Sequence, residues 1–158
     1  MTPSIQSLDA VHDRLGRQFE EHQRMLIEGD LERAREILEQ FARGLRAHAR
    51  HEEEVLLPVY EERVPRTRIG DPDTIREEHQ LIDKTLKGLE SRTAELRRDD
   101  SRWSEHLLAL LEDHYRFKQL LKHHNDREDR SLYPKLDEAC SPDERRSLLE
   151  AGEGPDSV

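Results

Sequence analysis

The sequence predicts an all-α fold, an up-down-up-down four-helix bundle with a short additional C-terminal helix. Apolar residues recur at steps of three and four in four long segments, the pattern of helices with one buried face. The breaks after the first and third segments are short, so the helices of each pair run antiparallel. Charged residues make up 39% of the chain and apolar residues 33%, which fits either long amphipathic helices or disorder, and the regular period favours helices.

The first two helices are predicted on either side of Gly29. Gly29 suits the left-handed position after a helix end, and the Asp30 carboxylate can accept from the free N–H groups of the next helix. The first stripe consists of Leu8, His12, Leu15, Phe19, His22 and Leu26. The second stripe consists of Ala34, Leu38, Phe41, Leu45, His48, Glu52 and Val55. Polar residues therefore occupy inward positions near the end of the second helix.

The third and fourth helices follow a connection over residues 64–72, which holds two prolines and a glycine. Thr74 and Glu77 have the spacing of a capping box for the third helix, and Ser101 is placed to cap the fourth. The third stripe consists of Ile75, His79, Ile82, Leu86, Leu89, Thr93 and Leu96. The fourth stripe consists of Leu107, Leu110, His114, Phe117, Leu121, His124 and Glu128.

The short additional helix is predicted over residues 142–151. Ser141, Pro142 and Glu144 combine an N-cap, a proline at the first helical position and a capping-box acid. We expect one domain over residues 1–158, with its core within about residues 8–138 and a frayed tail after Gly152.

Composition and charge exclude several classes of function. The net charge of −10 leaves no basic face for a phosphate backbone, so nucleic acid is not an expected partner. No apolar run reaches the ~20 residues that span a bilayer, and the first residues lack the features of a signal peptide. The lone Cys140 allows no internal disulfide, so we expect a cytoplasmic setting. Motifs of hydrolases and transferases are lacking, which favours a binding protein over an enzyme and leaves redox chemistry open.

One pattern occurs twice, at residues 48–58 and 124–134. In each copy a histidine precedes a glutamate by four residues, and an apolar pair and a proline follow at the same offsets. Residues four apart lie on one face of a helix, so each copy directs an imidazole and a carboxylate to one point. A single such pair is most simply a surface ion pair, but the repetition of the whole pattern favours metal ligands.

The predicted topology brings further histidines to the same level. An up-down-up-down chain collects, at one end, the starts of the first and third helices and the ends of the second and fourth. Six potential ligands occupy those places: His12, His48, Glu52, His79, His124 and Glu128. A single histidine on an apolar stripe is usually a hydrogen-bonded core residue. Four at one height, together with acids that are costly to bury unpaired, favour a metal site.

These residues resemble the hemerythrin-like, or HHE cation-binding, family, in which a four-helix bundle holds a non-haem di-iron centre. The resemblance extends from about Leu8 to Glu138 and is most specific in the two repeated motifs. It implies two iron ions joined by an oxo or hydroxo bridge. The implied ligands are Glu52 and Glu128 bridging both irons, His12 and His48 on one, and His79 and His124 on the other. Imidazole and carboxylate ligands suit iron, although zinc or manganese can occupy such a site.

The third helix departs from the family pattern. Oxygen-carrying hemerythrins have two histidines four apart there, whereas His79 is preceded by Ile75 and followed by Asp83 at that spacing. Asp83 either replaces the missing imidazole or is an exposed acid beside Lys87, and we expect the second. His51 either joins the site or has a supporting or surface role, and we again expect the second. Surface positions are expected for Glu53, Glu54, His123 and Asp129, while the role of Glu78 is left open.

The resemblance implies a protein that binds two irons and, through them, dioxygen, nitric oxide or peroxide, as a sensor, scavenger or iron store. The missing imidazole argues against stable, reversible oxygen carriage. One alternative keeps the same site and makes the protein an iron donor in the repair of iron–sulfur clusters under oxidative or nitrosative stress. Another is a metal-free structural or partner-binding bundle. The sequence does not indicate the oligomeric state.

His22 and His114 form a second expected pair. They lie ten residues from His12 and His124 on antiparallel helices, so they should face each other ~15 Å from the irons. Each ring would have the other, Tyr115 or a water as its polar partner. The alternative is that one ring turns out to solvent. We expect a structural role or a polar step for protons or small ligands, rather than a second metal site.

Overall fold

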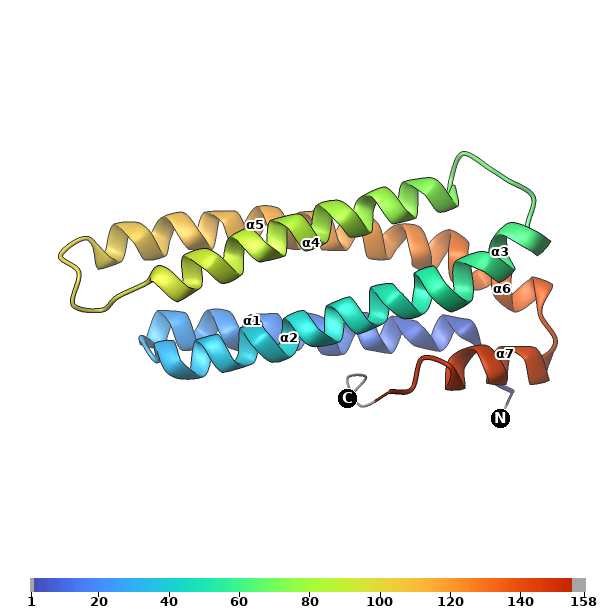
Figure 1. Cartoon of the computed structure of the whole chain (residues 1–158), viewed down its shortest axis with the longest axis horizontal. Coiled ribbons are helices and arrows are strands. Elements are labelled where there is room, and N and C mark those ends of the chain that lie inside the picture. The colour runs from blue at the N-terminus through green and yellow to red at the C-terminus, as the bar shows by residue number, and fades with distance from the viewer. Residues whose placement is uncertain (1, 155–158) are drawn as a thin grey trace.

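The computed structural model describes residues 2–154, and its regular structure is entirely helical within that range. Figure 1 shows two long helical hairpins side by side, which confirms the predicted all-α bundle with its extra helix. The first hairpin consists of α1 (Asp9–Glu28) and α2 (Leu31–His51), and the second of α4 (Pro72–Glu95) and α5 (Trp103–Arg127). The shorter helices are a 3₁₀ turn at Ile5–Leu8, α3 (Leu57–Arg63), α6 (Tyr133–Ala139) and α7 (Pro142–Glu150).

The turn between α1 and α2 forms as the sequence predicts. Gly29 adopts a left-handed conformation, with φ of 80°, and donates its N–H to the carbonyl of Leu26. The side chain of Asp30 accepts from the N–H of Arg33 and so caps α2. Ser141 and Glu144 likewise form the predicted capping box at the start of α7.

The predicted caps of α4 and α5 are wrong. Helix α4 begins earlier than Thr74, because Asp71 accepts from the N–H of Asp73 and Pro72 already has the backbone angle of a first helical residue. Helix α5 begins at Trp103, and its first turn is held by Asp100 instead of Ser101. The expectation of a frayed tail falls partly on residues 155–158, which lie outside the described residues.

The repeated motifs form π-helical turns, at Glu52–Leu56 and Glu128–Leu132. In these turns the N–H groups of Leu57 and Tyr133 bond to carbonyls five residues earlier. A proline follows each turn, and its missing N–H interrupts the α-helical ladder, which accounts for the local change. The chain stays helical through each turn and continues as α3 or α6. The places where the sequence predicts the ends of the second and fourth helices are therefore wider helical turns. Turns of this kind often occur at functional sites.

The core consists of two apolar groups of buried side chains. The larger group fills the bundle between the two hairpins and includes Phe19, Phe41, Leu86, Leu89 and Phe117. The smaller group includes Ile5, Leu56, Leu57, Ile75, Leu132 and Leu136. Asp137 of α6 accepts from the backbone N–H groups of Ile5 and Gln6, which fixes the N-terminal turn over this second group. None of the described helices combines the length and the apolar composition needed to cross a bilayer.

His22 and His114 meet inside the larger apolar group, as expected. Both side chains are fully buried, and their ring centroids lie 5.2 Å apart. His22 donates its Nδ1–H to the carbonyl of Ala34 at 2.8 Å, and the amide of Gln23 lies 3.4 Å from His114 Nδ1. Tyr115, proposed as a partner from the sequence, is 65% exposed and does not take that place.

The pair makes folding sensitive to acid. Burial lowers the pKa of His22 and, with the charge of His22, lowers the pKa of His114 to about 3. Histidine in the unfolded chain has a pKa near 6.5, so the unfolded state binds more protons below that pH. Protonation of His114 in the unfolded chain therefore favours unfolding, and the free energy of unfolding decreases as the pH falls below 6.5.

Between pH 6.5 and pH 5 the free energy of unfolding should decrease less steeply with falling pH in His114→Leu than in the wild type. We expect the two slopes to differ by up to ~1.4 kcal/mol per pH unit. Denaturant unfolding at several pH values measures this slope. His106→Leu is the matched control, because His106 lies on the same helix with 46% of its side chain exposed. An equal slope in His114→Leu and the wild type would contradict the argument.

Candidate metal centre

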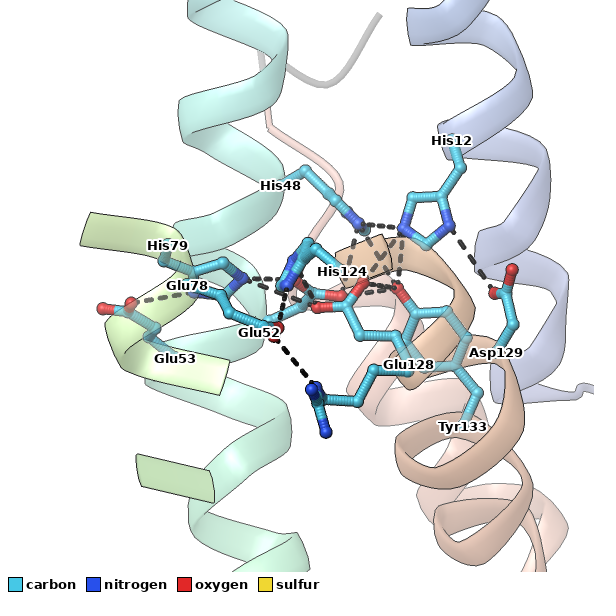
Figure 2. Close-up of polar contacts among 11 residues, drawn as sticks. His12, His48, Glu52, Glu53, Glu78, His79, His124, Glu128, Asp129 and Tyr133 are labelled. Carbon is cyan, nitrogen blue, oxygen red and sulfur yellow. Dashed lines mark hydrogen bonds and ion pairs between the residues drawn. The ribbon is translucent and has the colours of Figure 1, made fainter. Parts of the chain in front are cut away.

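Six polar side chains converge between the two apolar groups. They form two sets of four, and within each set one ligand atom per residue lies within 4.8 Å of the others. One set is His12, His48, Glu52 and Glu128, and the other is Glu52, His79, His124 and Glu128. All six residues expected from the sequence are thus brought together, with both carboxylates shared. Figure 2 shows the four imidazoles arranged around the two acids.

Local backbone structure places these side chains. Glu52 and Glu128 are the first residues of the two π-helical turns, and each lies one helical turn after a histidine of its motif. His12 and His79 lie on α1 and α4, the first helices of the two hairpins. The four long helices therefore meet at one level, as the topology requires.

The distances within the centre are those of groups directed at common points. The Nε2 atoms of His12 and His48 lie 2.9 Å apart. The contacts of imidazole Nε2 atoms with the acids are His48 to Glu52 at 3.3 Å, His79 to Glu52 at 3.2 Å, His12 to Glu128 at 3.2 Å and His124 to Glu128 at 2.8 Å. Glu52 and Glu128 are completely buried. Each acid therefore contacts imidazoles from both hairpins.

Several of these buried atoms lack a hydrogen bond. Among the described residues, Glu52 Oε2, His79 Nε2 and Glu128 Oε1 are buried without a hydrogen-bond partner. His79 Nε2 lies within ion-pair distance of both acid atoms, but it is not aligned for a hydrogen bond with either. Buried polar atoms are normally paired or coordinate a metal. Imidazole nitrogen and carboxylate oxygen are suitable donors for a transition-metal ion, so these residues fit a metal centre.

The imidazoles carry the charge that balances the acids. Burial lowers the pKa of His79, but close contacts with Glu128 and Glu52 outweigh it and raise this pKa to about 10. Burial also lowers the pKa of His124, but the charge of Glu128 outweighs this effect and raises the pKa to about 9. At His48 burial dominates and lowers the pKa. A metal ion that binds here must therefore displace protons from His79 and His124.

Comparison with known families identifies this arrangement. The model of the hemerythrin HHE cation-binding domain matches residues 4–136 of the chain. The chain belongs to this family. Comparisons with curated proteins and with solved structures find no significant match. The described part of this hemerythrin HHE domain therefore has both the expected fold and a His/Glu cluster that fits a metal site.

Two further acids, Glu53 and Glu78, hydrogen-bond imidazoles of the HHE domain from outside the centre, and a third, Asp129, lies within ion-pair distance of His12. The contacts are His79 Nδ1 to Glu53 Oε1 at 2.8 Å, His124 Nδ1 to Glu78 Oε2 at 2.9 Å and His12 Nδ1 to Asp129 Oδ1 at 3.5 Å. Holding Nδ1 on the outside directs Nε2 to the centre. The expectation that Glu53 and Asp129 are simple surface residues is wrong, because each is half-buried against an imidazole. Glu78, left open from the sequence, also pairs with Arg127.

The remaining candidates lie outside the centre. Asp83 accepts from Arg46 at 2.7 Å and contacts Lys87 at 2.7 Å, so it is an ion-paired acid and not a substitute for the missing imidazole. His51 is buried and donates its Nε2–H to the carbonyl of Leu148, which attaches α7 to α2. His123 and Glu54 are exposed, as expected.

Sequence analysis missed Tyr133, whose hydroxyl lies inside the HHE centre (Figure 2). It donates to Glu52 Oε1 at 2.5 Å and lies 3.1 Å from His12 Nε2. Burial, together with the charges of Glu128 and Glu52, raises the pKa of Tyr133 well above its usual value. The residue belongs to the second repeated motif, where the first motif has Leu57, and this difference was the available signal.

A small cavity of about 30 Å³ adjoins the centre between α2, α4 and α5. Its lining includes four of the six clustered side chains, namely His48, Glu52, His79 and His124. The rest consists of the apolar residues Leu45, Ala49, Ile82 and Leu86 and the polar residues Arg46, Asp83 and Asn125. Such a space admits one or two molecules of the size of water.

We expect Glu53→Ala to weaken metal binding by ~10–100-fold, because His79 loses the acid that holds its Nδ1–H outward. Competition with a chelator measures this affinity. Glu54→Ala is the matched control, since the adjacent Glu54 is exposed and makes no contact with an imidazole of the centre. Equal affinities of the two variants would contradict an orienting role for Glu53.

Proposed function

We propose that this protein binds two non-haem iron ions and, through them, a small ligand such as dioxygen, nitric oxide or peroxide. The observation that carries the proposal is the pair of four-residue sets that share both carboxylates. Two shared acids between two pairs of imidazoles suit two ions held close together, with the acids bridging them. His12 and His48 would hold one ion, and His79 and His124 the other.

The donor atoms support iron as the metal. Structural zinc sites are commonly rich in thiolate, and the single thiol, Cys140, lies in the second apolar group away from the centre. Imidazole and carboxylate donors suit iron, and bound iron would supply redox change and open coordination positions. Cys140 is a free thiol, which also suits the proposed cytoplasmic setting.

The surroundings of the centre support a small ligand. The cavity beside His79 and His124 has room for a diatomic molecule or peroxide, and Leu45, Ala49, Ile82 and Leu86 give it an apolar side. Asp83, at the position where oxygen carriers have a second imidazole, lines the cavity and is ion-paired with Arg46 and Lys87 instead of belonging to either set of ligands. One coordination position near the cavity is therefore left without a protein ligand.

The role of a sensor, scavenger or iron store follows from ligand binding at such a centre. The iron-donor alternative uses the same residues, and no particular contact favours it. A metal-free structural bundle is less consistent with the buried atoms of Glu52, His79 and Glu128 that lack hydrogen bonds.

Metal analysis of anaerobically purified, iron-loaded protein tests the proposal. We expect about two irons per chain, a visible spectrum that changes when oxygen is added, and a melting temperature that falls on chelation. His12→Leu should lose at least one iron, because it removes one of two imidazoles from the first set.

His22→Leu is the matched control for this experiment. It removes a buried imidazole from the same helix, but His22 lies with His114 in the larger apolar group. It should keep both irons. Wild-type protein that binds no iron, or whose melting temperature is unchanged by chelator, would exclude the proposed function.

A second experiment tests the cavity as the position of the small ligand. We expect Ala49→Leu to slow nitric oxide binding to the reduced, iron-loaded protein by about tenfold, the effect of ~1.4 kcal/mol added to the barrier. The larger side chain would fill part of the 30 Å³ cavity that Ala49 lines. Stopped-flow absorbance measures the rate.

Ala47→Leu provides the control for the cavity experiment. Ala47 lies two residues away on α2, but it lines a separate groove between α1, α2 and the end of α7. Its rate should match the wild type. If both variants bind nitric oxide at the wild-type rate, the ligand does not use the cavity.

A further inference from the structure

The hydroxyl of Tyr133 contacts every member of the first set of four residues. It lies 2.5 Å from Glu52 Oε1, 3.1 Å from His12 Nε2, 3.3 Å from His48 Nε2 and 3.3 Å from Glu128 Oε2. These are the atoms that would surround an ion bound by this set. A side chain that only supported the centre would contact one of the ligands from outside, whereas this oxygen lies among all four, as Figure 2 shows.

The packing of Tyr133 holds this position. The whole residue is buried, with its ring in the second apolar group and 5.7 Å from the ring of His12. Tyr133 is the first residue of α6 and follows directly after the π-helical turn that begins at Glu128. The backbone thus fixes the phenol and the bridging acid of its motif together.

The other half of the centre has no counterpart to this phenol. The equivalent residue of the first motif is Leu57, the first residue of α3 after the turn that begins at Glu52. Leu57 is fully buried in the second apolar group and offers no donor atom. Among the described residues, the set containing His79 and His124 therefore consists of these two imidazoles and the two shared carboxylates.

We propose that Tyr133 is itself a metal ligand, binding through its phenol oxygen to the ion held by His12 and His48. This inference rests on the proposed di-iron function and adds an oxygen donor that makes the two metal positions unequal. Phenolate oxygen is an established ligand of ferric iron, as in haem proteins with an axial tyrosine. The phenol releases its proton to solvent when it binds the ferric ion, so the step involves no change of oxidation state.

The inequality indicates which ion takes the small ligand. Two imidazoles, two bridging carboxylates and the phenol surround the first position, whereas the second has no phenol. The cavity is nearer the second position, since its lining contains both His79 and His124 but only His48 of the first pair of imidazoles. The exogenous ligand therefore binds at the ion held by His79 and His124, where no phenol adds to the protein ligands.

Resonance Raman spectroscopy of the iron-loaded, oxidised protein tests the assignment. Ferric phenolate absorbs visible light, and excitation in that band enhances the vibrations of the bound tyrosine ring. We expect these vibrations in the wild type, a shift of their frequencies in protein made with ring-deuterated tyrosine, and their loss in Tyr133→Phe. Iron content, measured on the same samples, should stay at about two per chain in Tyr133→Phe, because the imidazoles and bridging acids remain.

The other two tyrosines provide matched controls. Tyr60 is buried and lies near Ser131, and Tyr115 is exposed, so Tyr60→Phe and Tyr115→Phe should keep the vibrations. Wild type with two ferric irons and no tyrosine vibrations would overturn the assignment while leaving the proposed function intact. Vibrations that persist in Tyr133→Phe would also overturn it. Wild-type protein that binds no iron would overturn both the assignment and the proposed function. The isotope experiment uses the wild type alone, so it does not depend on the folding of any variant.

Discussion

Two fully buried carboxylates, Glu52 and Glu128, determine the arrangement of this end of the molecule. Burial raises the pKa of Glu128, but the charge of His124 and contacts with His12 outweigh it and hold this pKa well below its usual value. An acid kept ionised in an apolar interior must have cationic neighbours, because removing one partner of a buried pair costs ~3–5 kcal/mol. Imidazolium groups or metal ions meet this need, and exchange between the two couples metal binding to proton release.

The widened turns connect the repeated sequence to this geometry. Each turn follows a histidine by one helical turn, starts at the bridging acid and is followed by a proline. Because the helices continue beyond the turns as α3 and α6, apolar side chains close the centre on the side opposite the larger core. The polar layer therefore lies between two water-excluding groups, and the small cavity adjoins it. In this environment a few polar atoms decide what binds.

Sequence periodicity was sufficient to predict the bundle and the convergence of the six clustered residues, because helix spacing and topology together fix height and facing direction. It could not assign Tyr133, since the change from 3.6 residues per turn to a π-helical turn alters which residue follows Glu128 inward. Nor could it distinguish Glu53 and Asp129 from ordinary surface acids, because their role depends on contacts across helices. The caps of α4 and α5 failed for a local reason, since Asp71 accepts from the N–H of Asp73 and Asp100 from the N–H of Arg102, so neither helix needs Thr74 or Ser101 as its cap. The extent of the domain over residues 1–158 stays a prediction.

The distribution of ligands between the hairpins has a mechanical consequence. His12 and His48 come from the first hairpin and His79 and His124 from the second, while each acid contacts imidazoles of both. At this end the chain joins the hairpins only through the exposed segment between α3 and α4. Bound metal would therefore act as a reversible crosslink between two halves of one polypeptide, stabilising the closed form by a free energy that rises with the logarithm of the metal concentration relative to its dissociation constant. Metal would then add to the apolar contacts that hold the two hairpins together.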